Sequence, residues 1–125
     1  MKKFLFALSL AAAAAALSSS AVAHHSAAMF DQKKTIAVHG TLKEFQYTNP
    51  HSWLMVIVVR PNGSMVEWSF ETEGPSTLMR AGIKPKAFQT GDEVTVTANP
   101  MRDGRPAGSL ISVTKADGTV YRTRP

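Results

Sequence analysis

The sequence predicts a mainly β protein, built as a five-stranded, partly closed barrel with one short helix between strands three and four. Apolar residues recur at every second position over most of the chain, as half-buried strands require. Turn-forming Gly, Pro and Asn residues separate these runs, and one short stretch has helical spacing. A chain of 125 residues is long enough for one domain with one core.

The N-terminus has the pattern of a secretory signal peptide. Lys2 and Lys3 precede an apolar run over residues 4–17, and Ala21-Val22-Ala23 matches a small-x-small cleavage site. The run is shorter than the roughly 20 residues that span a bilayer, so we expect cleavage after Ala23; a retained membrane anchor is the alternative. The chain then divides into a signal peptide (1–23), an N-terminal segment (24–34) and a barrel domain (35–125).

Composition and leader together predict a periplasmic or secreted protein of bacterial type. The chain has no Cys, so in an oxidising compartment its stability must come from a packed core without disulfides. The leader holds two lysines and no acidic residue, so its removal lowers the net charge from +5 to +3. Basic residues are scattered, with one modest cluster at Arg102, Arg105, Arg122 and Arg124. This pattern does not favour a nucleic-acid partner.

The first strand is expected to carry a bulge. Apolar alternation runs from Ile36 to Leu42 and resumes out of phase at Phe45, and one extra residue near Lys43-Glu44 produces that shift and bends the strand. The segment from Thr48 to His51 ends the strand, because Pro50 cannot donate to a ladder and restricts the residue before it.

The second strand, Trp53 to Arg60, is expected to join the third through Pro61-Asn62-Gly63, a type I turn with a glycine bulge. In this register Arg60 opposes Ser64. The inner face then carries Leu54, Val56 and Val58 with Val66, Trp68 and Phe70, and the outer face carries Trp53, Met55, Ile57 and Val59 with Met65, Glu67, Ser69 and Glu71. A two-residue Asn-Gly turn is the alternative, and it would reverse the side chains of one strand.

A short helix is expected from Ser76 to about Ala81, with Leu78 and Met79 as its apolar contacts and Gly82 as its stop. A strand at 93–98, a loop at 99–108, a strand at 109–114 and an edge segment at 119–121 follow. The expected interior residues are Val56, Val58, Val66, Trp68, Phe70, Val94, Val96, Ile111 and Val113.

Three strands, a helix and two strands is the order of an oligonucleotide/oligosaccharide-binding (OB) barrel, and an open β-sandwich fragment is the alternative. In an OB-like barrel the ligand meets the face of strands two and three, between the first loop, here 49–51, and the loop between strands four and five, here 99–108. The predicted ligand-binding face therefore consists of His51, Trp53, Met55, Glu67, Ser69, Glu71, Arg102 and Arg105.

Several sequence blocks resemble a family of small secreted bacterial proteins classed as a domain of unknown function. The most specific blocks are Asn49-Pro50-His51-Ser52-Trp53 and Arg102-Asp103-Gly104; the others are His24-His25-Ser26, Met29-Phe30-Asp31, Gly40 to Phe45, Glu67-Trp68 and Gly91-Asp92. The resemblance covers nearly the whole mature chain. It implies a shared fold and export, and it brings neither an activity nor catalytic residues.

The residues themselves do not favour an enzyme. The chain has no Cys, no Gly-x-Ser-x-Gly elbow and no phosphate loop. Glu67, Ser69 and Glu71 alternate along one strand, which is also the pattern of a solvent-facing polar edge. We therefore expect a non-catalytic protein.

Two candidate metal sites involve histidine. Cleavage after Ala23 gives His24 a free amine beside its imidazole, with His25 next in the chain, and such nitrogens suit Cu²⁺ or Ni²⁺. The alternative is a polar terminus without a site.

The second candidate is His51, Trp53 and Met55 at alternate positions of one strand, a soft set that favours Cu(I). It resembles the periplasmic copper chaperones of metal-efflux systems, which are OB barrels that bind Cu(I) through His, Trp and two Met. This chain departs from them because Met65 lies too far along the sheet to supply the second thioether. The alternative is that Trp53 and Met55 are packing residues.

The favoured function is therefore that of a small exported, non-catalytic binding or interaction protein, with an unknown protein or small ligand of the cell envelope as its partner. A periplasmic copper-binding protein is one alternative, with Cu as its possible cofactor. A binder of envelope polysaccharide, with Trp53 as a stacking platform, is the other. Without such a metal, no cofactor is expected.

Overall fold

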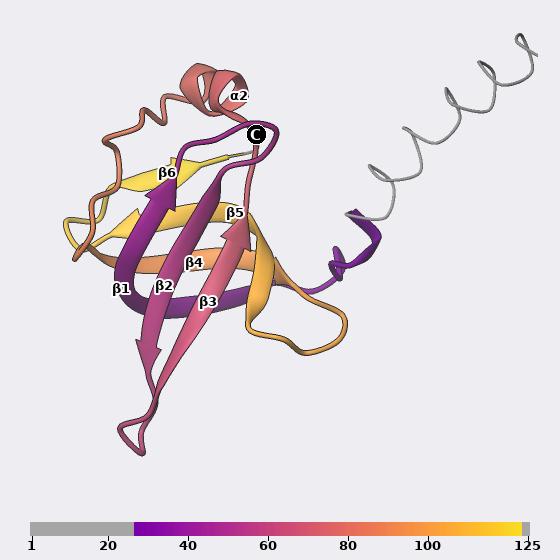
Figure 1. Cartoon of the computed structure of the whole chain (residues 1–125), viewed down its shortest axis with the longest axis vertical. Coiled ribbons are helices and arrows are strands. Elements are labelled where there is room, and N and C mark those ends of the chain that lie inside the picture. The colour runs from indigo at the N-terminus through magenta and orange to yellow at the C-terminus, as the bar shows by residue number, and fades with distance from the viewer. Residues whose placement is uncertain (1–26, 124–125) are drawn as a thin grey trace, which may run out of the picture.

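The computed structural model describes residues 27–123, which form a closed five-stranded barrel with a further short strand (Figure 1). The elements are β1 (Ile36–Gln46), β2 (Trp53–Val59), β3 (Met65–Glu71), α2 (Pro75–Arg80), β4 (Glu93–Pro100), β5 (Ala107–Lys115) and β6 (Val120–Arg122). The strands are ordered β3-β2-β1-β4-β5-β6, and parallel pairing of β3 with β5 closes the barrel. The mainly β prediction, with a helix between strands three and four, is confirmed.

Both local predictions for the first three strands are confirmed. The β1–β2 register shifts between Leu42 and Glu44, so the expected bulge is at Lys43. At the hairpin, the Arg60 N–H donates to the Ser64 carbonyl at 2.8 Å, and Gly63 has a φ of 81°. The three-residue loop is therefore present, and it pairs Val56 with Trp68 across the two strands.

The expected interior is largely confirmed. Val56, Phe70, Val94, Val96 and Val113 are buried in the core, and Val58 and Trp68 pack against it while half-buried. Trp68 stacks on Phe70 with ring centroids 5.8 Å apart.

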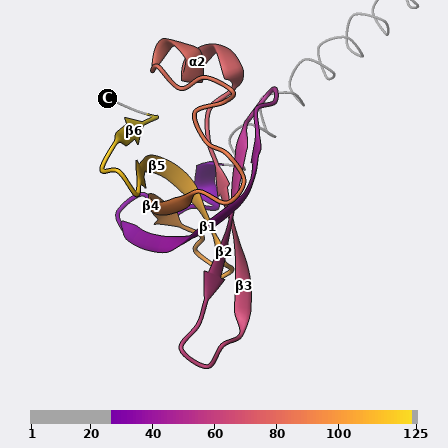
Figure 2. The ribbon, with the colours of Figure 1, turned by 90° about the vertical axis from the view of Figure 1, so that its left-hand side faces the viewer.

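Two expected interior residues, Val66 and Ile111, do not belong to the core. Val66 lies on the outer part of the β2–β3 hairpin, which extends beyond the barrel at the end opposite α2 (Figures 1 and 2). Ile111 is unpaired at a second irregularity, where Thr97 pairs with Ser112 but Ala98 pairs with Leu110. This bulge changes the phase of β5, so that Leu110 is buried in place of Ile111.

The helix α2 lies at one end of the barrel (Figure 2). It begins at Pro75, one residue earlier than expected, because proline is well tolerated in the first helical turn. Leu78 is fully buried, but Met79 is 49% exposed, so the expected packing role of Met79 is wrong. Ile83 is buried instead, and the Tyr47 hydroxyl donates to the carbonyls of Pro75 and Ile83 at 3.0 Å each.

The loop between β4 and β5 is shorter than expected. Both strands extend further toward it, because Asn99 pairs with Ser109 and Pro100 pairs with Gly108. The connection is therefore reduced to residues 101–106. Among residues 27–123 no helix is long and apolar enough to cross a membrane.

Candidate functional site

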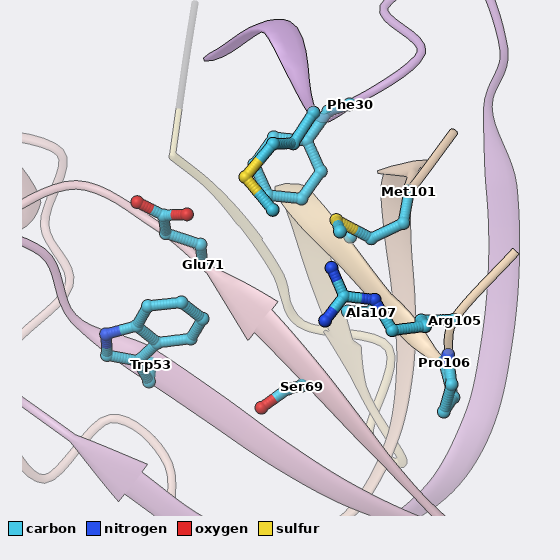
Figure 3. A pocket seen from close by; sticks show the side chains of 10 residues that line it. Phe30, Trp53, Ser69, Glu71, Met101, Arg105, Pro106 and Ala107 are labelled. Carbon is cyan, nitrogen blue, oxygen red and sulfur yellow. The ribbon is translucent and has the colours of Figure 1, made fainter. Parts of the chain in front are cut away.

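A cavity of about 500 Å³ lies against the outer face of β2 and β3, where β3 meets β5 (Figure 3). Its walls come from the two strands, from β5, from the segment before β1 and from the loop after β4. The lining residues are Met29, Phe30, Trp53, Ser69, Glu71, Met101, Arg105, Pro106, Ala107 and Gly108.

The segment before β1 is fastened to the β4–β5 loop by main-chain hydrogen bonds. Phe30 forms an isolated antiparallel bridge with Met101, and the Arg102 N–H donates to the Met29 carbonyl at 2.9 Å. The Arg102 guanidinium also donates to the Ala28 carbonyl at 3.0 Å. Phe30 is 8% exposed as a result, and Met29 and Phe30 form one wall of the cavity.

The sheet side of the cavity is set by strand register. Trp53 pairs with Glu71 across β2 and β3, and Ser69 pairs with Ala107 across the parallel β3–β5 junction. The Ser69 N–H donates to the Pro106 carbonyl at 3.1 Å. The outward positions of three strands therefore meet beside the loop.

The β4–β5 loop carries Arg105 in a fixed turn. Asp103 accepts the Arg105 backbone N–H at 3.1 Å and the Arg105 Nε–H at 2.7 Å. The backbone hydrogen bond, followed by the one from the guanidinium, holds the pKa of Asp103 below its usual value of 3.8. Asp103 is therefore an ionised carboxylate at neutral pH, and it binds Arg105 along one edge.

Glu71 joins the cavity to His51. The His51 Nδ1 lies 2.5 Å from Glu71 Oε1, and the Glu71 side chain is only 14% exposed. His51 does not line the cavity, but its carbonyl accepts the Thr48 hydroxyl at 2.9 Å. The carboxylate thus orients an imidazole at the edge of the site.

Four residues of the predicted ligand-binding face meet in the cavity: Trp53, Ser69, Glu71 and Arg105. The others lie elsewhere. Met55 is 8% exposed and does not line the cavity.

Glu67 lies away from the cavity and accepts a hydrogen bond from the Lys43 ammonium at 2.6 Å. This hydrogen bond and the negative charge of Glu67 raise the pKa of Lys43. Arg102 holds the segment before β1, and His24 and His25 lie outside the described residues.

Met29, Phe30, Met101, Pro106 and Ala107 were not among the predicted ligand-binding residues. The sequence contained two partial signals for them. Met29 and Phe30 are apolar residues in a polar segment, and an OB-like order places the β4–β5 loop beside strands two and three. Neither signal identifies which side chains face Trp53.

The cavity contains soft metal ligands in addition to the carboxylate of Glu71. Among residues 27–123, no three His, Asp or Glu side chains gather as a metal site requires. The thioethers of Met29 and Met101 line the same cavity as Trp53. A thioether pair suits Cu(I) and disfavours Zn²⁺.

The fold and the cavity define a small β-barrel protein with a mainly apolar cavity on the outside of its sheet. The chain belongs to DUF6152, a family of unknown function whose model matches residues 12–110. Comparison with curated proteins and with solved structures gives no match. The family match confirms the resemblance to a domain of unknown function, and the matched residues include every residue that lines the cavity.

Proposed function

We propose that this protein is an exported, non-catalytic binding protein that holds a small ligand in the cavity beside Trp53. The observation that carries the proposal is the cavity itself. Its volume of about 500 Å³ lies within the roughly 300–1,000 Å³ of small-molecule sites, and it combines a mainly apolar lining with a few polar groups, as such sites do.

The hydrogen bonds around the cavity support this proposal. The segment at 28–31 and the loop at 101–106 are each bonded to their neighbours through the main chain. A site whose walls are held before the ligand arrives loses less conformational entropy on binding. The strand order β1-β2-β3-β5-β4 also supports an OB-like class, in which strands two and three carry the ligand face.

A neutral fluorescent probe tests the site. N-phenyl-1-naphthylamine should bind the purified protein with a rise in emission, because an apolar lining releases ordered water and contacts the rings. Ala107→Phe should weaken this binding by about tenfold or more, since the new ring would fill the cavity. Ala116→Phe is the matched control at an exposed turn residue. Absence of probe binding, or equal binding by both variants, would remove the proposed site.

Export has its own test. The Ala21-Val22-Ala23 pattern supports a mature chain that begins at His24. Intact-mass measurement of protein expressed in its own host should give the mass of residues 24–125. A mass that includes the leader would contradict both the predicted processing and the amine chelate at His24.

A copper-binding function is the second candidate, and the two thioethers beside Trp53 are the observation that favours it. Cu(I) held by Met29 and Met101 should quench Trp53 emission, because an indole interacts with a nearby cation. Met29→Leu and Met101→Leu should each weaken the response, while Met65→Leu, at the exposed hairpin, serves as the control. Met55→Leu is a further comparison, because Met55 was the ligand expected from the sequence but does not line the cavity. Unchanged emission on Cu(I) addition would exclude this function at the cavity.

A further inference from the structure

We propose that the ligand of the cavity is an amphipathic organic anion, whose carboxylate, sulfate or sulfonate group binds the guanidinium of Arg105. Its apolar body lies against Trp53 and Met101. This inference rests on the proposed function and names the class of ligand that the same site takes.

Arg105 is held so that one edge of its guanidinium remains available. Asp103 accepts a hydrogen bond from the Arg105 Nε–H at 2.7 Å and another from the Arg105 backbone N–H. Within residues 27–123, neither terminal nitrogen of Arg105 forms a hydrogen bond or ion pair with another side chain. Figure 3 shows the guanidinium directed into the cavity beside Met101 and Ala107, and Asp103 is not part of the lining.

The geometry of that edge matches an oxyanion. The two terminal nitrogens of a guanidinium present parallel N–H donors that bind two oxygens of a carboxylate, sulfate or sulfonate group together. The turn at Asp103 fixes the direction of this fork before the ligand arrives, which lowers the entropic cost of binding.

The rest of the lining requires an apolar body on the same ligand. Phe30 and Met101 are each 8% exposed, and they lie with Trp53 around the cavity (Figure 3). An indole and a thioether offer polarisable contact surface to a ring or a hydrocarbon chain. A small hydrated anion would leave this surface exposed to water.

Glu71 determines which end of the cavity takes the charge. Its carboxylate lies on the side of Trp53 and is held by the His51 imidazole at 2.5 Å. Figure 3 places Glu71 and Arg105 on different sides of the cavity. An anionic group beside Glu71 would meet a like charge, so the ligand is oriented with its anion at Arg105.

The test compares two probes with the same aromatic body. 8-Anilinonaphthalene-1-sulfonate carries a sulfonate that N-phenyl-1-naphthylamine lacks, so the difference between their affinities measures recognition of the anion. The wild-type protein should bind the sulfonate about tenfold or more tightly than the neutral probe, as charge-assisted hydrogen bonds allow. Arg105→Gln should remove that advantage, so that the ratio of the two affinities falls to about one. A circular dichroism spectrum equal to that of the wild type shows that the fold of the variant is intact.

Two further variants distinguish recognition by the planar guanidinium of Arg105 from attraction by positive charge alone. Arg60→Gln removes one positive charge from the exposed hairpin and should leave both affinities unchanged. Arg105→Lys keeps the charge but loses the planar fork, and should keep only part of the advantage. Equal wild-type affinities for the two probes, or an unchanged advantage in Arg105→Gln, would overturn the organic-anion proposal while the cavity remains a binding site. If neither probe binds, the proposed function fails as well.

Discussion

Aspartates in the loops of this protein act mainly on the backbone. The pKa values of Asp92, Asp103 and Asp117 all lie below the usual value of 3.8, and in each the first cause is a backbone N–H, donated by Gln89, Arg105 and Thr119 respectively. Such contacts define a turn locally. Such hydrogen bonds can be predicted from the sequence, because each Asp lies two or three residues from its partner.

Asp92 contacts a lysine as well as a backbone N–H. Its Oδ2 accepts the Gln89 N–H at 3.0 Å and lies 3.3 Å from the Lys115 ammonium. A carboxyl with a lowered pKa in the folded state adds stability above its unfolded value, and this stability is lost as the pH falls through the folded value. Asp92→Asn should therefore lower the free energy of unfolding at pH 7 by about 1 kcal/mol or less, since the pair is partly exposed. Urea titrations should show this difference shrinking as the pH falls below 3.8; a constant difference would contradict the linkage.

The path of β1 depends on two special positions in this strand, the bulge at Lys43 and the glycine at position 40. The bulge at Lys43 bends β1 so that it pairs with β2 along one part and with β4 along another. Gly40 lies just before that bend and passes very close to β2. A methyl group there would overlap the Ile57 carbonyl oxygen and approach the Val56 side chain at 2.8 Å. Glycine is therefore required at this position for space.

Gly40→Ala should destabilise the protein by about 2 to 3 kcal/mol, because the backbone of β2 would have to move within a packed barrel. Gly63→Ala is the matched comparison. Its φ of 81° is unfavourable for alanine, but no atom lies within 4 Å of the new methyl group, so the cost should be about 1 kcal/mol. Chemical denaturation of both variants checks the order. A smaller loss for Gly40→Ala than for Gly63→Ala would contradict the close approach of β1 and β2.

Parallel pairing of β3 with β5 closes the barrel. Phe70 is fully buried on β3 and pairs with Gly108 of β5 at the parallel junction. A side chain at Gly108 would meet the Asn99 carbonyl oxygen at 2.8 Å and Ala98 Cβ at 3.0 Å. This junction both closes the barrel and brings Ala107 and the β4–β5 loop to the cavity.

Phe70→Ala should lower the free energy of unfolding by about 3 to 5 kcal/mol, because it leaves a void at the centre of the closure. Val120→Ala, on the exposed edge strand β6, should change it by about 0.5 kcal/mol or less. Thermal unfolding followed by far-UV circular dichroism measures both. A loss for Phe70→Ala no larger than that for Val120→Ala would mean that the junction does not support the barrel.

The features that could be predicted from the sequence are those that depend on neighbouring residues. The bulge at Lys43, the hairpin register at Gly63 and the helix that ends shortly before Gly82 are each set within a few positions, by the phase of apolar alternation or by the φ that a turn requires. The same local information placed Trp53, Ser69 and Glu71 on one outward face. It failed at Ile111, where a bulge in β5 has no signal in the alternation of the strand itself.

Which side chains meet across the cavity depends on contacts between segments that are far apart in the sequence. Met29 precedes Met101 by 72 positions in the sequence, and both line the same cavity as Trp53 because the segment before β1 pairs with the β4–β5 loop. Ala107 reaches the same cavity through closure of the barrel, because the β3–β5 pairing places it opposite Ser69. Closure depends on the packing of the whole core, so no short stretch of sequence contains it. Asp103 holds Arg105 locally, but the cavity that the guanidinium faces is formed by these distant segments of the chain.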